Sequence, residues 1–201
     1  MRGRDGLAYE YSAQNHDWDL TLHAAAELIK AGVVLDKKPM LGTLSMGFSF
    51  FTGGMVLSFA AIESFAASIA FSMPSSQKFA NFDFQKYRKA RRFWDKLDQL
   101  MSAADIAVDK GSGLFQHIGL MQDWRNLVTH ASPYEIEPTE IANSHDAPGK
   151  LHAPKWHLEY TRMADAEHAK KFYETACAFI DLVKKRTDLD PCASVTYKPL
   201  T

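Results

Sequence analysis

The chain has 201 residues, 46% of them hydrophobic and 23% charged, which is the composition of a globular protein and excludes a disordered chain. Its formal net charge is −1, so any contact with RNA has to come from a local basic patch rather than from the charge of the whole protein. Two cysteines, Cys177 and Cys192, are too few for a disulfide or metal framework, and the N-terminal residues lack an apolar core of signal-peptide type. We therefore expect a cytoplasmic protein.

The first half of the chain is expected to hold two helices after an irregular arm, residues 1–18. Apolar residues recur near helical spacing over residues 19–35, and a charged stretch that includes a proline ends this helix. A second helix is expected over residues 55–73. The segment 40–54 between them is ambiguous, because Gly53-Gly54 marks either a break or a close packing point inside a longer helix.

The most apolar stretch of the chain lies between Lys38 and Lys78, where Glu63 is the only charged residue. It exceeds the roughly 20 residues that a membrane-spanning helix needs. It is also rich in Gly, Ser and Thr and lacks the dense Leu, Ile and Val content of such a helix. A buried or interface helix is therefore favoured over a membrane span, because core helices are apolar all round. A membrane-associated protein that uses residues 40–73 remains an alternative.

The second half is expected to hold three further helices, over residues 84–104, 114–131 and 165–186. A proline-rich segment, residues 132–162, precedes the last of them, and the alternating run 156–160 within it fits an edge strand or an extended loop. The tail after the last helix is expected to be irregular. The residues of helix 114–131 that are expected to be buried are Phe115, Ile118, Leu120, Met121, Trp124, Leu127 and Val128.

These elements predict an all-α fold, a helical bundle of four to five helices with a long loop before the last helix. A single domain over residues 1–201 is the simplest organisation. Its core is expected over about residues 50–186, with the N-terminal arm and first helix over 1–38 and the insertion over 132–162.

The candidate site lies late in helix 114–131, at Arg125-Asn126 and Thr129-His130. Residues four apart share a helix face, so Asn126 neighbours His130 and Arg125 neighbours Thr129. Arg125 and His130 are about 140° apart around the axis, so the long arginine side chain has to bring its guanidinium round to the imidazole.

These residue types suit the cleavage of RNA by attack of a ribose 2′-OH on its own phosphate. A histidine with a pKa near 6.5 can act as acid or base, and a guanidinium can bond two oxygens of the charged phosphate. Asn126 could hold the imidazole tautomer or contact the phosphate. The scheme needs no metal or cofactor and leaves a 2′,3′-cyclic phosphate end. His145, Asp146, His152 and His157 match no known metal-ligand spacing, so no metal site is expected.

The sequence Arg125-Asn126-(three residues)-His130 resembles the R-N-x-x-x-H motif of HEPN-domain ribonucleases. The apolar stretch Ala61-Ile62-Glu63-Ser64-Phe65 also resembles the first bundle helix of that family, and the architectural likeness covers about residues 50–186. The resemblance implies a metal-independent endoribonuclease with Arg125, Asn126 and His130 as catalytic residues. It also implies a toxin–antitoxin or defence setting, with a protein antitoxin as a partner.

In that family two copies of the motif meet across a two-fold axis, which implies a homodimer. The small residues Ala60-Ala61 and Ala66-Ala67 would suit such a contact. Other family members use the bundle for scaffolding or nucleotide binding. A non-catalytic module for dimerisation or for binding RNA or a nucleotide is therefore the alternative.

Glu63 and Thr129 are candidate supporting residues. Glu63 either positions Arg125 or His130 or is a buried acid that another basic residue satisfies. A basic run farther along the chain is either a solvated helix face or a patch that contacts the phosphates of RNA. Its candidate RNA-binding residues are Arg88, Lys89, Arg91 and Arg92.

Overall fold

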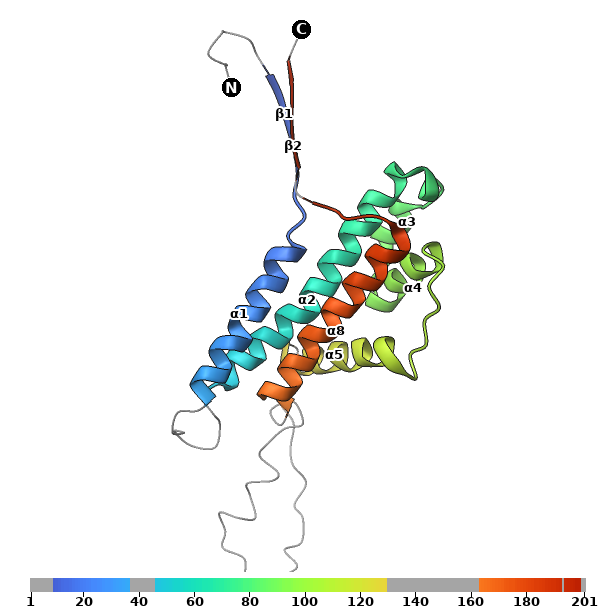
Figure 1. The fold of residues 1–201 in the computed structure, drawn as a ribbon. Coiled ribbons are helices and arrows are strands. Elements are labelled where there is room, and N and C mark those ends of the chain that lie inside the picture. Colours follow the sequence, from blue (N-terminus) through green and yellow to red (C-terminus); the bar gives the residue numbers. More distant parts are fainter. Residues whose placement is uncertain (1–8, 37–45, 130–162, 193, 200–201) are drawn as a thin grey trace, which may run out of the picture. The chain divides into compact units, whose positions relative to one another are not determined.

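The computed structural model describes residues 9–36, 46–129, 163–192 and 194–199 (Figure 1). Six α-helices lie within these ranges: α1 (Trp18–Asp36), α2 (Phe48–Ser72), α3 (Phe84–Lys89), α4 (Phe93–Ala103), α5 (Gly113–Thr129) and α8 (Ala166–Thr187). Two 3-10 helices, η1 (Met73–Ser75) and η2 (Gln77–Phe79), connect α2 to α3. The expected all-α helical bundle is confirmed. The insertion 132–162, with the run 156–160, lies outside the described residues.

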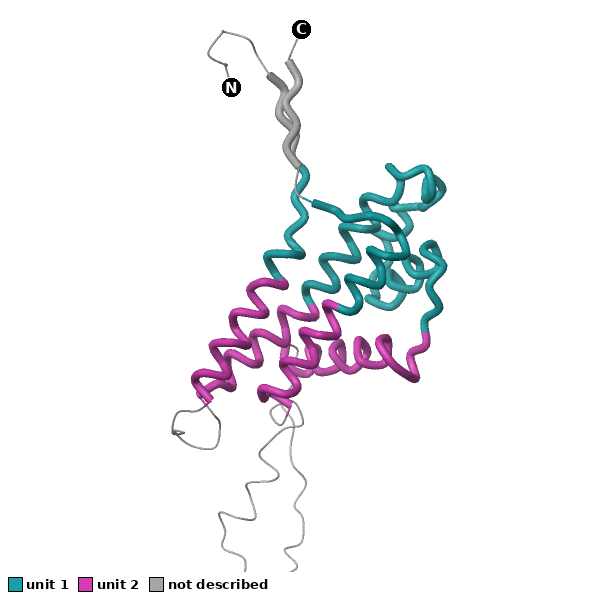
Figure 2. The backbone as a smooth tube through the Cα atoms, in the orientation of Figure 1, with its two compact units in different colours: residues 1–21, 60–108, 178–201 teal, residues 22–59, 109–177 magenta. Residues whose placement is uncertain are grey.

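The chain forms two compact units, which are coloured separately in Figure 2. Unit 1 comprises Met1–Thr21, Ala60–Val108 and Ala178–Thr201, and unit 2 comprises Leu22–Phe59 and Asp109–Cys177. The limits of the units fall inside α1, α2 and α8. Each unit therefore gathers segments that are far apart in the sequence.

Aromatic side chains anchor the core of unit 1. The Phe65 ring meets the Trp18 ring edge-on at 5.0 Å and the Phe179 ring at 6.3 Å, geometries in which a ring edge faces a π-surface. The indole Nε1 of Trp18 donates a buried hydrogen bond of 3.0 Å to the carbonyl of Pro191. This bond satisfies the polar group of Trp18 and ties the start of α1 to the segment after α8.

Glycines allow α1 and α2 to approach closely within unit 2. A Cβ atom placed on Gly54 would lie 2.5 Å from Cγ1 of Ile29, and one on Gly32 would lie 2.6 Å from the Phe51 ring. Gly53 and Gly54 both lie inside the uninterrupted helix α2. Of the two alternatives for this pair, the close packing point is therefore correct, and α2 begins at Phe48 rather than at residue 55.

The single helix expected over residues 84–104 is wrong, because the structure divides it into α3 and α4. Asp83 caps α3 by accepting a 2.9 Å hydrogen bond from the Lys86 amide, and the backbone turns extended at Ala90 (φ −64°, ψ 131°) and Arg92 (φ −89°, ψ 143°). No Gly or Pro marks this break, and the apolar spacing continues across it. The sequence pattern therefore gave no signal for the turn.

The irregular arm and tail expected at the two ends of the chain are also corrected. Strands β1 (Tyr9–Gln14) and β2 (Ser194–Pro199) form an antiparallel two-stranded sheet within unit 1, with Tyr9 opposite Pro199 and Gln14 opposite Ser194. An alternation of apolar and polar residues is visible in both segments. It was too short to predict strands whose partner lies at the other end of the chain.

One helix among the described residues is long and apolar enough to cross a membrane by length and composition. It covers Phe48–Ser75, with a mean hydropathy of 1.7, and 61% of its most apolar window is buried inside the protein. A core helix of a soluble protein passes the same test, which agrees with the preference for a buried helix over a membrane span.

Candidate functional site

Helix α5 carries Arg125, Asn126 and Thr129 in unit 2, and its buried face packs into the core. Trp124 is 2% exposed and meets the Phe172 ring of α8 edge-on at 5.5 Å. Phe115, Ile118 and Met121 are buried on the same helix, as expected. Because Trp124 is held in the core, the next residue, Arg125, emerges at the margin of the buried face and is half-buried.

Arg125 is oriented by two described neighbours. Its Nη1 donates a 3.2 Å hydrogen bond to the side-chain oxygen of Asn126, and its guanidinium carbon lies 6.0 Å from the centre of the Phe59 ring. An aromatic face attracts a guanidinium, so the ring helps to hold the charged group in position. Both contacts restrict the position of the guanidinium.

Of the other motif residues, the structure describes Thr129 but not His130. Thr129 is the last residue of α5, and its hydroxyl donates a 2.9 Å hydrogen bond to the Arg125 carbonyl. The expected nearness of Thr129 and Arg125 is therefore confirmed, although the contact runs through backbone rather than through the guanidinium. His130 lies outside the described residues. Its expected proximity to Asn126 stays a prediction.

The expected buried set of α5 is wrong at two positions. Leu120 and Leu127 are each 50% exposed, whereas Val128 is half-buried. Leu120 and Leu127 are two turns apart and share one side of the helix, next to the exposed Asp123. An apolar strip thus lies open along the helix that carries Arg125.

The candidate RNA-binding residues lie in unit 1, around the break that sequence reasoning missed. Arg88 and Lys89 end α3, and Arg91 and Arg92 lie in the turn before α4. All four side chains are exposed. They do not form one continuous helix face, because the chain turns at Ala90.

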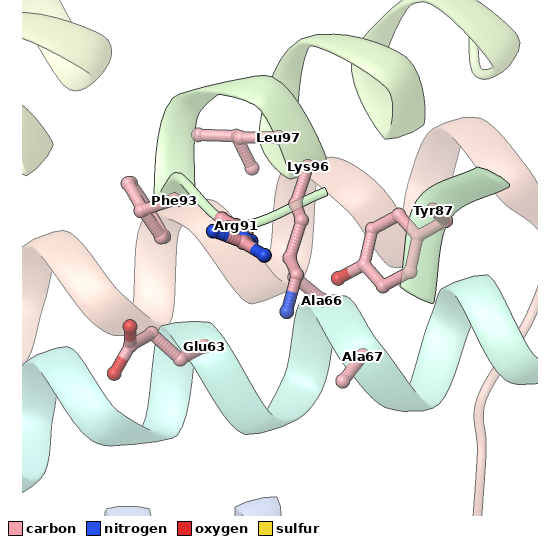
Figure 3. A pocket seen from close by; sticks show the side chains of 8 residues that line it. All are labelled: Glu63, Ala66, Ala67, Tyr87, Arg91, Phe93, Lys96 and Leu97. Carbon is pink, nitrogen blue, oxygen red and sulfur yellow. The ribbon is translucent and has the colours of Figure 1, made fainter. Parts of the chain in front are cut away.

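Glu63 lies on α2 in unit 1 and is half-buried rather than fully buried. It lines a pocket of about 100 Å³ with Tyr87, Arg91 and Lys96, over a floor that includes Ala66 and Ala67 (Figure 3). Burial, together with the negative charge of Glu63, raises the pKa of Tyr87 to about 12. The structure therefore places Glu63 in a cluster that includes Arg91, and its expected role toward Arg125 stays a prediction.

Sequence reasoning missed Tyr87 and Lys96 as members of this cluster. Neither residue is among the site residues that the sequence predicts. The ammonium of Lys96 lies 5.8 Å from the centre of the Tyr87 ring. The helix break brings the two together with Arg91, so no spacing rule for one long helix could have grouped them.

A second hollow of unit 1, of about 420 Å³, is lined in part by His16, Asp17, Ser64 and Ser68. His16 is 7% exposed and its ring lies 6.1 Å from that of Phe71. Within the described part of the chain, no hydrogen bond joins His16 to either serine. The structure therefore does not assemble an activated serine here.

No group of three or more His, Cys, Asp or Glu residues that could hold a metal ion occurs among the described residues. His145, Asp146, His152 and His157 lie outside them.

Comparison with protein-family models, with curated proteins and with solved structures finds no match to this chain.

Proposed function

We propose that the protein is a metal-independent endoribonuclease of HEPN type that acts as a homodimer on RNA. The observation that carries the proposal is the arginine of the motif. Arg125 is half-buried at the end of α5, hydrogen-bonded to Asn126 and lying against the Phe59 ring. A guanidinium held in this way is prepared to stabilise a phosphate that gains negative charge during strand cleavage.

In this proposal His130 exchanges protons with the ribose 2′-OH and the leaving 5′-oxygen, and Arg125 bonds the phosphate oxygens. The bond from the 2′-oxygen to phosphorus forms as the bond to the 5′-oxygen breaks. The products are a 2′,3′-cyclic phosphate and a 5′-hydroxyl. Asn126 acts through Arg125 by accepting its Nη1–H, so we assign Asn126 a positioning role.

The open apolar strip on α5 supports the homodimer. Leu120 and Leu127 lie on the helix that bears Arg125, and each is 50% exposed. A two-fold contact uses the same patch on both copies, so two such strips could cover each other and bring two motifs together. The exposed Arg88, Lys89, Arg91 and Arg92 would add sequence-independent contacts with the RNA backbone.

The test is RNA cleavage by the full chain in the presence of a metal chelator. The variants are Arg125→Ala and His130→Ala, and the matched control is His117→Ala, a histidine within α5. We expect the two motif variants to lose at least about 100-fold in cleavage rate, and the control to retain the wild-type rate. The product should carry a cyclic phosphate by mass spectrometry, and RNA with 2′-O-methyl groups should stay intact.

Equal and negligible cleavage by all four proteins would overturn the proposal. If the wild type then retarded RNA in a gel and Arg125→Ala did not, the non-catalytic RNA-binding module would take its place. Sedimentation of Leu120→Glu and Leu127→Glu variants tests the dimer separately. Unchanged mass with full cleavage would exclude a dimer through α5.

A further inference from the structure

We infer that the pocket between α2 and the α3–α4 turn is a binding site for a phosphate group, held by Arg91, Lys96 and the hydroxyl of Tyr87. This site is separate from the ribonuclease proposal, and its test does not depend on whether the protein cleaves RNA. The three donors come from three consecutive elements, namely Tyr87 from α3, Arg91 from the turn and Lys96 from α4.

The strongest sign of a ligand is the hydroxyl of Tyr87. The residue is 4% exposed and lines the pocket, yet its hydroxyl makes no hydrogen bond within the described part of the chain. Figure 3 shows the hydroxyl directed toward the space beside the Lys96 amine. The hydroxyl oxygen is not itself sealed off, since Thr52 Oγ1 is the fully buried side-chain oxygen without a partner among the described residues. It is therefore free to donate its proton to a ligand oxygen that enters the pocket.

The charges of the pocket point to an anion. Neither Arg91 nor Lys96 forms an ion pair with any described residue, and Figure 3 shows both cationic groups facing the same space. Two cations that converge repel each other, and an anion between them removes that cost. Glu63 also lines the pocket, and its negative charge acts on Tyr87, but Figure 3 shows its carboxylate pointing away from Tyr87 and Lys96.

The N-terminus of α4 adds to the positive charge around the pocket. Phe93, its first residue, lines the pocket, and no side chain caps the helix at Arg92. The partial positive charge of a helix N-terminus favours phosphate at that end. The helix alone would not define a site; it reinforces the three side-chain donors.

The volume of the pocket and the number of its hydrogen-bond donors indicate which anion it would bind. A volume of about 100 Å³ corresponds to roughly three water molecules at about 30 Å³ each, which is too small for a nucleoside and suits a single oxyanion. Three donors from different directions match a tetrahedral phosphate better than a planar carboxylate with two oxygens. The phosphate is then either the free ion or the terminal group of a chain whose remainder stays outside.

The test measures binding of inorganic phosphate to the full chain by calorimetry, with ionic strength held constant by chloride. Lys96→Met removes the charge but keeps an apolar stem against Tyr87, and Lys86→Met is its matched control because Lys86 is exposed on α3 and does not line the pocket. We expect Lys96→Met and Arg91→Ala to lower the affinity about tenfold or more. Lys86→Met should change it by less than about twofold.

Tyr87→Phe separates the site from the fold. Because the hydroxyl has no described partner, this variant should melt at the wild-type temperature or higher without phosphate, and it should bind phosphate about two- to tenfold more weakly. A lower melting temperature without phosphate, together with unchanged affinity, would mean that the hydroxyl serves the fold.

Two further arms identify the source of the phosphate. A short oligoribonucleotide with a 5′-phosphate is compared with its 5′-hydroxyl form in wild type and Lys96→Met. A preference for the phosphorylated form that Lys96→Met abolishes assigns the terminal phosphate of a strand, whereas binding of inorganic phosphate alone assigns the free ion. No binding of either, binding of acetate as tight as phosphate, or equal weakening by Lys96→Met and Lys86→Met would overturn the inference.

Discussion

Alanine substitutions of Gly53 and Gly54, two neighbouring glycines of α2, test how closely α1 and α2 approach each other in unit 2. Both lie in the interior of the helix, so replacing either with alanine should gain about 0.5–1 kcal/mol in helix propensity. Their surroundings differ. A Cβ on Gly53 would meet only Cδ1 of Leu28, at 3.1 Å, whereas a Cβ on Gly54 would lie 2.5 Å from Cγ1 of Ile29 and 3.2 Å from the carbonyl oxygen of Ala25.

The two contacts should give opposite signs. Cδ1 of Leu28 is the end of a flexible side chain and can move away, so Gly53→Ala should stabilise the protein by up to about 1 kcal/mol. Cγ1 of Ile29 belongs to a β-branched residue with restricted χ1, and the Ala25 carbonyl is backbone, so neither moves freely. Overpacking of this kind costs about 1–3 kcal/mol, and Gly54→Ala should therefore be less stable than Gly53→Ala by that amount.

Thermal unfolding of the two variants, followed by circular dichroism, checks this directly. A difference of about 1–3 kcal/mol corresponds to roughly 2–12 °C in Tm for a chain of this size. The comparison cancels the propensity term because the two positions are adjacent in one helix. If Gly54→Ala melted at or above the temperature of Gly53→Ala, the close approach of α1 and α2 at Gly54 would be refuted.

Two other predictions concern Tyr87 and Trp124. Because the pKa of Tyr87 is raised from 10.0 to about 12, the folded state keeps the phenol proton that the unfolded state loses, so stability is intact below about pH 10 and falls by about 2–3 kcal/mol as the pH rises to 12. Urea denaturation should show this additional loss in wild type and not in Tyr87→Phe; equal slopes would contradict it. Trp124→Ala empties a site that is 2% exposed and should cost about 3–5 kcal/mol in urea, whereas Trp94→Ala, at a half-buried position, should cost less. Equal costs for the two would argue against Trp124 as the anchor of α5.

The helices could be predicted where one apolar face continues for several turns. The helical spacing over residues 19–35 and 165–186 predicts both ends of α1 and of α8 to within one residue. Prediction failed where a local turn interrupts that spacing without a Gly or Pro, as at Ala90. It also failed at Leu120 and Leu127, because spacing alone cannot say how much of an apolar helix another element covers.

The motif could be found from the sequence, but its surroundings could not. Spacing placed Arg125 and Thr129 on one face, and the structure confirms their contact. The approach of the Arg125 guanidinium to the Phe59 ring depends on packing between elements, and so does the grouping of Tyr87, Arg91 and Lys96 beside α2. Such contacts leave no trace in residue spacing.

The sheet formed by β1 and β2 has a consequence for the order of folding. Its partners Tyr9 and Pro199 are separated by roughly 190 positions, and closing a loop of that length in an unfolded chain costs about 4–5 kcal/mol of entropy. A two-stranded sheet by itself is marginally stable, so it cannot supply that free energy. The Trp18–Pro191 hydrogen bond shortens the loop to a few residues on each side once unit 1 has folded. The two strands should therefore pair last in folding and exchange their amide hydrogens first, so that protection of their amides implies that unit 1 is still folded.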